Sequence, residues 1–224
     1  MKLIEYPDRE MMMIDLANQL AGELSAALTH QDTVSLAVPG GTTPGPIFDV
    51  LCAADLDWDR VDVMLSDERW VPETSERSNT ALLRERLLVG RAAAARYLPL
   101  YAQAATPEEK LPELARSIEP ELPLSVLLLG MGTDMHTASL FPGADRLADA
   151  MAPDAPVLMA MRAPGAPEPR ITLTARVLRD AISKHIVITG DEKRKALETA
   201  RKLHDPLQAP ISAVLTGATV HWAE

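Results

Sequence analysis

A repeated alternation of short apolar runs with longer helical patterns places the strongest constraint on the fold. The runs cover residues 34–38, 61–65, 126–129 and 185–189. They are short and almost continuously apolar, which is typical of strands that a parallel sheet buries on both faces. Helical patterns separate them along the chain. This alternation predicts an α/β protein with a mostly parallel, open, Rossmann-like sheet and helices on both faces.

Further elements complete this expected fold. Residues 3–6 form a strand candidate, and residues 8–28 form a helix candidate because large apolar side chains recur there at intervals of four. Helices are also expected at residues 46–54, 80–88, 107–118, 174–182 and 191–203.

The Pro- and Ala-rich stretch 142–169 is expected to pass over one edge of the sheet and to carry a short strand at 157–161. Too little chain follows it for a second full domain. We therefore expect a single domain over residues 1–224.

Charge argues against two classes of partner. The 224 residues include 22 Lys or Arg and 32 Asp or Glu, which gives a formal net charge of −10. Such a chain is poorly suited to non-specific nucleic-acid binding and to an anionic membrane surface. An anionic substrate would need positive charge concentrated in one cleft.

The sequence sets few limits on cellular location and oligomeric state. Cys52 is the one cysteine, so no intramolecular disulfide is possible. The N-terminal residues do not resemble a signal peptide, and no apolar run approaches membrane-spanning length. We expect a cytoplasmic protein that is a monomer or a weak homo-oligomer. A metal site is weakly supported, because no second histidine lies at ligand spacing from another.

The loop after the first buried run has the composition of a phosphate-binding loop. It reads Gly40-Gly41-Thr42-Thr43-Pro44-Gly45 and leads into a helix. Glycines allow close backbone approach, and hydroxyl groups and helix-terminal amides bind anions. The loop matches neither the P-loop nor the dinucleotide-binding spacing, so a nucleotide is not indicated. An ordinary Gly/Pro turn is the alternative interpretation.

His136 is the candidate acid–base residue. Of the five histidines, it alone lies in a glycine-rich loop at the carboxyl end of an expected strand. His30 and His204 are expected near helix ends, and His185 and His221 within or next to strands. Asp134, two residues before His136, could orient its ring. No Ser or Cys is marked as a nucleophile, which favours direct activation of water by His136. A partly exposed loop histidine is the alternative.

Several polar residues at other strand and helix ends could contact an anion. Arg69, next to Asp67, could bind phosphate or stabilise an oxyanion, or could belong to a surface ion-pair turn. Ser78 and Asn79 open a helix, where they supply a cap, and they could also reach a ligand.

Two further cations are candidates. Arg170 precedes an apolar segment, and Lys193 lies in the first turn of an expected helix. A cation there opposes the helix dipole unless an anion offsets the cost. Lys195, two positions along, is expected to be a solvated charge.

Taken in order, these motifs resemble those of the 6-phosphogluconolactonases. The resemblance extends from about residue 34 to residue 222, nearly the whole chain. The matching blocks are residues 40–44, 66–72, 78–79, 130–142, 170–174 and 189–193. Each block alone is modest, and together they are specific.

The resemblance implies a fold of the sugar-phosphate isomerase (NagB) type. It also implies hydrolysis of 6-phospho-D-glucono-1,5-lactone to 6-phosphogluconate, the second step of the oxidative pentose phosphate pathway, without a cofactor. By the same resemblance, His136 acts on water and the ring ester, Asp134 positions it, and Arg69 binds substrate and stabilises charge. The implied substrate-binding and phosphate-binding residues are Gly40, Gly41, Thr42, Thr43, Asp67, Asn79, Arg170 and Lys193.

One residue departs from the family pattern. Met135 stands between Asp134 and His136, where the family usually has glycine. If that position needs a positive φ, methionine costs about 1 kcal/mol or more.

Two other functions remain in view. In a glucosamine-6-phosphate deaminase a glutamate follows the histidine, whereas residues 137–142 hold no carboxylate. A sugar-phosphate sensor would share the pocket without turnover. It would need a DNA-binding module for which the chain before the first strand has no room.

Overall fold

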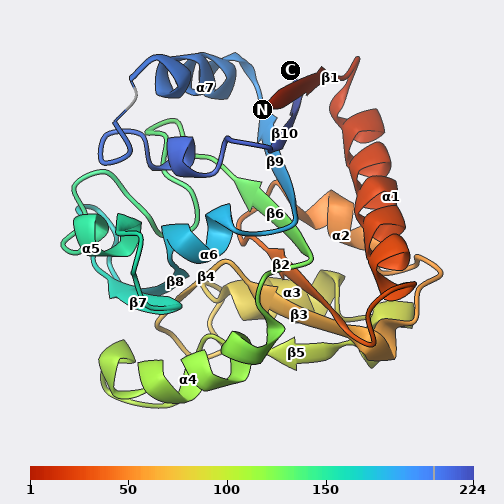
Figure 1. The fold of residues 1–224 in the computed structure, drawn as a ribbon, viewed down its shortest axis with the longest axis horizontal. Coiled ribbons are helices and arrows are strands. Elements are labelled where there is room, and N and C mark those ends of the chain that lie inside the picture. Colours follow the sequence, from red (N-terminus) through yellow and green to blue (C-terminus); the bar gives the residue numbers. More distant parts are fainter. Residues whose placement is uncertain (204) are drawn as a thin grey trace.

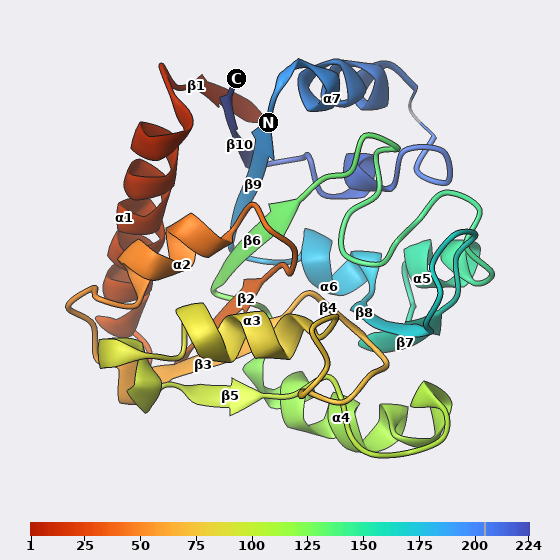
Figure 2. The same cartoon turned by 180° about the vertical axis from the view of Figure 1, so that it is seen from behind.

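A sheet of seven parallel strands forms the centre of the computed structural model, which describes residues 1–203 and 205–224 (Figures 1 and 2). His204, expected near a helix end, lies outside the described residues. Along the chain the strands are β1 (Lys2–Glu5), β2 (Val34–Val38), β3 (Val61–Leu65), β5 (Arg96–Leu98), β6 (Val126–Gly130), β9 (Ser183–Thr189) and β10 (Thr219–Ala223).

The order of the strands creates a crevice at the middle of the sheet. Side by side they run β1-β10-β9-β6-β2-β3-β5, so the chain moves from β2 toward one edge and then returns to place β6 on the other side of β2. Because all seven strands are parallel, their carboxyl ends share one edge of the sheet. The loops after β2 and β6 therefore diverge there, as at the ligand-binding crevice of open α/β sheets.

Helices cover both faces of this sheet. In Figures 1 and 2, α1 and α2 lie on one side of the central strands, and α6 lies on the other. The α-helices are α1 (Arg9–Leu28), α2 (Gly45–Leu51), α3 (Asn79–Arg86), α4 (Leu111–Ile118), α5 (Leu147–Met151), α6 (Ala175–Arg179) and α7 (Asp191–Leu203). Short 3-10 helices occupy Trp58–Arg60, Gly90–Ala94, Pro107–Glu109, Glu119–Glu121 and Pro210–Ala213.

The long N-terminal helix forms as its sequence predicts. Asp8 caps α1 by accepting a hydrogen bond from the backbone N–H of Met11 at 2.7 Å. The column of large apolar residues from Met12 to Leu28, spaced by four, is buried against the sheet and α2. No helix of the described residues has both the length and the apolar character to cross a membrane.

A second, antiparallel sheet was not predicted. It joins β4 (Asp67–Arg69) to β8 (Arg170–Leu173) and β8 to β7 (Leu158–Met161). The strand expected at 157–161 exists but belongs to this small sheet. Its partner β4 has three residues of polar sequence, too few for any periodicity, and pairs across about a hundred positions of chain. The pairing places Arg69 opposite Arg170.

Several helices are shorter than their patterns predict. The helix expected at 46–54 ends at Leu51, and that expected at 174–182 ends at Arg179. The pattern over 107–118 divides into a 3-10 turn and α4, since Pro107 and Pro112 each start a new helical segment.

A buried chain of hydrogen bonds connects α1 with β9 and β10. The Tyr6 hydroxyl donates to Asp15 at 2.7 Å and lies 2.9 Å from His221 Nδ1. His221 Nε2 lies 3.0 Å from His185 Nδ1, and His185 Nε2 lies 2.9 Å from Glu23. Burial lowers the pKa of His221 to about 4, and the neighbouring His185 adds to the effect.

The depressed pKa of His221 predicts a loss of stability in mild acid. Between the ordinary pKa of 6.5 and the folded value of about 4, the unfolded chain binds the extra proton and the folded chain does not. The free energy of unfolding should therefore fall by about 2 kcal/mol from pH 7 to pH 5. Urea unfolding at both pH values measures this change.

The variant His221→Gln should lose most of this pH dependence. The matched control His30→Gln changes an exposed histidine and should behave as the wild type does. Equal pH dependence in all three proteins would contradict the assignment to His221.

Candidate active site

A hollow of about 270 Å³ lies outside the carboxyl ends of β2 and β6. Its walls come from the loop after β2, the loop after β6, the small sheet, the start of α3 and the first turn of α7. Every predicted site residue except Asp134 lines it, which brings together segments spread over more than 150 positions. The predicted members of the lining are Gly40, Gly41, Thr42, Thr43, Asp67, Arg69, Asn79, His136, Arg170 and Lys193.

Two glycines shape the loop after β2. Gly41 has φ of +87°, a left-handed conformation that favours glycine. At Gly40, an added Cβ would lie 2.0 Å from Oδ1 of Asn79, so any other residue would displace that side chain. The amide of Asn79 is also fixed from the other side, where Nδ2 donates to the carbonyl of Asp67 at 2.9 Å.

His136 and Asp134 form a close pair at the rim of the hollow. Nδ1 of His136 lies 2.5 Å from Oδ1 of Asp134, and the same oxygen accepts the backbone N–H of His136 at 3.2 Å. The ring packs on Phe141 with centroids 4.2 Å apart. Because a carboxylate occupies Nδ1, the tautomer with the proton on Nδ1 is favoured, and Nε2 is left to exchange protons.

Gly132 makes room for this pair. A Cβ there would lie 2.2 Å from Nδ1 of His136 and 2.5 Å from Oδ1 of Asp134. The backbone of Gly132 also closes the loop, since its N–H donates to the carbonyl of His136 at 3.0 Å.

Met135 has the backbone conformation that its family position suggested. Its φ is +67°, so the methionine occupies the left-handed region and carries the cost expected there. Its carbonyl accepts the N–H of Ile211 at 3.1 Å, and its side chain is partly buried against the core. These contacts offset the strain and hold the loop that carries His136.

Two arginines and an aspartate form the wall made by the small sheet. Asp67 is buried, with Oδ2 accepting from the Ser139 hydroxyl at 2.5 Å and lying 3.8 Å from Nη1 of Arg170. Burial lowers the pKa of Arg170, and the neighbouring cation of Arg69 lowers it further. The Nε atoms of Arg69 and Arg170 are buried, and within the described part of the chain neither has a hydrogen-bond acceptor.

Lys193 adds a third cation from the first turn of α7. It is half-buried, and burial lowers its pKa. No carboxylate of residues 1–203 and 205–224 forms an ion pair with it. Lys193 therefore lies at a helix N-terminus, where a cation is unfavourable, without an ion-pair partner in the described chain. An anion in the hollow would offset both costs.

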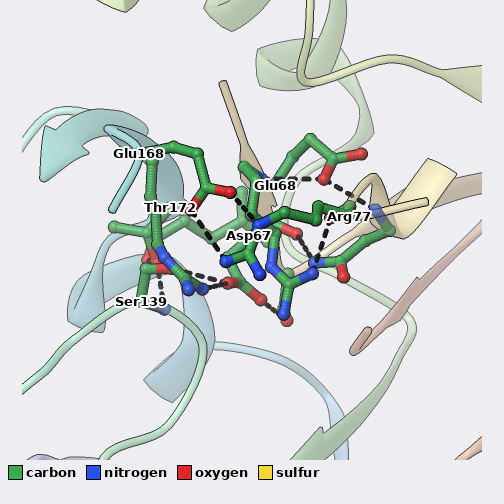
Figure 3. A network of polar contacts seen from close by, with 11 residues as sticks. Asp67, Glu68, Arg77, Ser139, Glu168 and Thr172 are labelled. Atoms are coloured by element: carbon green, nitrogen blue, oxygen red, sulfur yellow. Dashed lines mark hydrogen bonds and ion pairs between the residues drawn. The ribbon is translucent and has the colours of Figure 1, made fainter. Parts of the chain in front are cut away.

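Sequence reasoning missed the residues behind this wall (Figure 3). Glu68 is fully buried and accepts hydrogen bonds from the start of α3, and Ser139 and Thr172 connect the loop after β6 to β8. Glu68 lies within the matching block 66–72, but a charged residue in a polar run gives no sign that it will be buried. Among the described residues, no three His, Cys, Asp or Glu side chains gather as they would around a metal ion.

Comparison with known proteins identifies the family of this chain. Residues 7–222 match the model of the glucosamine-6-phosphate isomerases/6-phosphogluconolactonase family. The chain belongs to this family. The resemblance inferred from the motifs is thereby confirmed.

Curated relatives of this family are similar over nearly the full chain. A 6-phosphogluconolactonase of Rhizobium meliloti (strain 1021) is 43% identical over 215 residues, which cover 93% of this chain and 92% of the relative. One from Pseudomonas aeruginosa PAO1 is 43% identical over 211 residues, covering 92% of this chain and 88% of the relative.

Solved structures confirm the α/β fold class. A 6-phosphogluconolactonase from Shewanella baltica OS155 has a TM-score of 0.96 and 31% identity, covering 100% of this chain and 97% of that one. A monomeric glucosamine-6-phosphate deaminase of the NagB superfamily has a TM-score of 0.83, with 100% and 98% coverage. At 15% identity, it shares the fold alone.

The contact of Gly132 with the His136–Asp134 pair gives a prediction. In Gly132→Ala, the new Cβ should separate the carboxylate from Nδ1, and the ring should lose its preference for the Nδ1–H tautomer. The ¹⁵N chemical shifts of the His136 ring report this change. Gly22→Ala is the control, because a Cβ at Gly22 in α1 has no atom within 4 Å. An unchanged tautomer in Gly132→Ala would contradict the tight fit.

Proposed function

We propose that the chain is a 6-phosphogluconolactonase, which hydrolyses 6-phospho-D-glucono-1,5-lactone to 6-phosphogluconate. The observation that carries the proposal is the hollow itself. It combines a histidine that has one ring nitrogen held by a carboxylate with three cations and a glycine-rich, hydroxyl-bearing loop. This is the chemistry that an ester bearing a phosphate dianion requires. The two relatives that are 43% identical are 6-phosphogluconolactonases, which supports the proposal.

The 6-phosphate binds between the loop after β2 and α7. Thr42 and Thr43 offer hydroxyl groups, the glycines allow the backbone to approach, and Lys193 supplies charge. In a chain with a net charge of −10, this local cation draws the dianion to the site against the overall field. Binding the phosphate also stabilises Lys193, which has no carboxylate partner in the described chain.

The reacting end of the lactone then lies near His136. Nε2 of His136 takes a proton from water as its oxygen attacks the C1 carbonyl carbon, which forms a tetrahedral intermediate. That intermediate collapses with cleavage of the bond between C1 and the ring oxygen. The histidine returns its proton to that oxygen, and the product is the open-chain acid. Asp134 stabilises the imidazolium and holds the ring orientation, as in hydrolytic triads.

Arg69 and Arg170 face the developing charge. Both side chains line the hollow, so their guanidinium groups can donate charge-assisted hydrogen bonds to a substrate oxygen. Asp67 holds Arg170 in place and can accept hydrogen bonds from sugar hydroxyls. Asn79 adds an amide beside Gly40. These preorganised groups stabilise the oxyanion of the tetrahedral intermediate.

Lactone hydrolysis above the spontaneous rate tests the proposal. The lactone is generated in situ, and 6-phosphogluconate is followed through a coupled dehydrogenase, with a protein-free blank because this lactone opens unaided in water. His136→Ala should lower kcat by about two to four orders of magnitude, because it removes the general base. Asp134→Asn keeps the ring and should cause a smaller loss.

Two results would contradict parts of this proposal. No acceleration by the wild-type protein would exclude the lactonase. Acceleration that survives in His136→Ala would leave the reaction in place and exclude the histidine mechanism.

The phosphate assignment has its own test in α7. Lys193→Ala should raise KM at least tenfold and change kcat little, because phosphate binding is shared by the ground and transition states (an estimate of about 1.4 kcal/mol or more). Lys195→Ala is the matched control, since Lys195 is exposed two positions along the same helix and does not line the hollow. Steady-state kinetics of both variants decide the point. An unchanged KM in Lys193→Ala would remove Lys193 from the phosphate site.

A further inference from the structure

Glu68 is a fully buried carboxylate that lies between two residues of the hollow's lining, Asp67 and Arg69, in the chain; Figure 3 shows it within a network of polar contacts. Its Oε2 accepts hydrogen bonds from the Ser78 hydroxyl at 3.0 Å and from the N–H and hydroxyl of Thr80, each at 2.7 Å. Its Oε1 accepts the backbone N–H groups of Arg69 at 2.7 Å and Asn79 at 2.8 Å. Five donors therefore converge on one side chain.

These contacts exceed what is needed to cap α3. Ser78 already caps the helix, because its hydroxyl accepts the N–H of Ala81 at 3.3 Å. No Lys, Arg or His of the described chain forms an ion pair with Glu68, so hydrogen bonds alone compensate the burial of its charge. Such a group is costly to bury and is stable only where its donors are held in fixed positions.

The two donors at Oε1 belong to residues that line the hollow. Arg69 lies at the end of β4 and Asn79 at the start of α3, so one oxygen fixes the distance between two separate segments of the wall. Asn79 is held further by the carbonyl of Asp67 and by the bare backbone of Gly40. A shift of Asn79 would therefore change its position relative to the loop after β2.

We propose that Glu68 is a positioning residue for lactone hydrolysis, and that its carboxylate sets the place of Asn79 and Arg69 against the glycine loop. This inference rests on the lactonase activity proposed above. Glu68 does not line the hollow and takes no part in proton transfer. It acts through the two backbone N–H groups.

The substitution Glu68→Gln tests this role with almost no change of shape. A glutamine amide NH₂ cannot accept a hydrogen bond. In either orientation at least one backbone N–H therefore loses its acceptor: those of Arg69 and Asn79, or that of Thr80. The start of α3 must then shift. We expect kcat/KM to fall by about ten- to a hundredfold in protein that circular dichroism shows to be folded.

A double-mutant cycle separates positioning from a purely structural role. In the Asn79→Ala background, the side-chain amide that Glu68 holds in place is already gone and only Arg69 is left to be displaced, so Glu68→Gln should lower kcat/KM by less than about threefold. Asp62→Asn is the matched control. Asp62 is a buried carboxylate on the neighbouring strand β3, paired with Arg96 and away from the hollow, and its removal should leave kcat/KM within about twofold of wild type.

Two results would overturn the proposal. One is a Glu68→Gln variant with a lowered melting temperature but wild-type kcat/KM. The other is an equal loss of kcat/KM with and without Asn79.

If Glu68→Gln does not fold, the variant Thr80→Val tests the positioning role of Glu68 instead. It removes one donor to the carboxylate and keeps the charge, and it should lower kcat/KM about three- to tenfold only when Asn79 is present. Wild-type kcat/KM in Thr80→Val would then count against positioning.

If the wild-type protein hydrolyses no lactone, the proposed function fails. The positioning role is then decided by the affinity for 6-phosphogluconate, measured calorimetrically in the same cycle.

Discussion

The parallel pairing of β2 with β6 is the contact on which the rest of the molecule depends. These strands are neighbours in space, but the chain leaves them toward opposite edges of the sheet. Their carboxyl-end loops must therefore separate, and the gap cannot be filled by a direct connection. One loop brings Gly40 to Thr43 and the other brings Gly132 to His136, so the groups proposed to bind an anion and the proposed acid–base residue meet although they are far apart in the sequence.

The small antiparallel sheet holds two arginine side chains in a partly buried position, where a positive charge is unfavourable. Arg69 and Arg170 are opposite each other in the β4–β8 register and would repel without compensation. Asp67 supplies a counter-charge on the hollow side, while Glu68 does not line the hollow and its burial is compensated by hydrogen bonds. The alternation of a strand sends these adjacent carboxylates to opposite faces. Asp67 therefore forms the ion pair with Arg170 in the hollow, and Glu68 connects β4 to the start of α3 by hydrogen bonds.

The sequence predicted the main sheet because its signals are local. Each buried run carries its own apolar composition, and each is followed by its own glycine or polar turn, so the parallel direction of the strands follows from their alternation with helices. Much of the lining of the hollow could be predicted for the same reason, because the loops that follow parallel strands lie at the same edge of the sheet. The partners of β4 could not be found this way. Asp67 to Arg69 looks like a surface turn, and only its contact with residues 170–172 makes it a strand. Burial of Glu68 and Ser139 depends on that same distant pairing, so it left no local trace.

The loop after β6 shows how strain and close packing serve one geometry. Gly132 is small because the His136–Asp134 pair occupies the space where a side chain would be. Three residues on, Met135 adopts a positive φ that a glycine would adopt freely. The methionine is tolerated because its carbonyl is bound by Ile211 and its side chain packs on the core, so the contacts that hold the loop also oppose its relaxation. A glycine at position 135 would remove the strain and the side-chain anchor together. Met135 therefore accepts backbone strain and keeps a side-chain contact between the core and the loop that carries His136. A loop anchored in this way suits the oriented acid–base role proposed for that histidine.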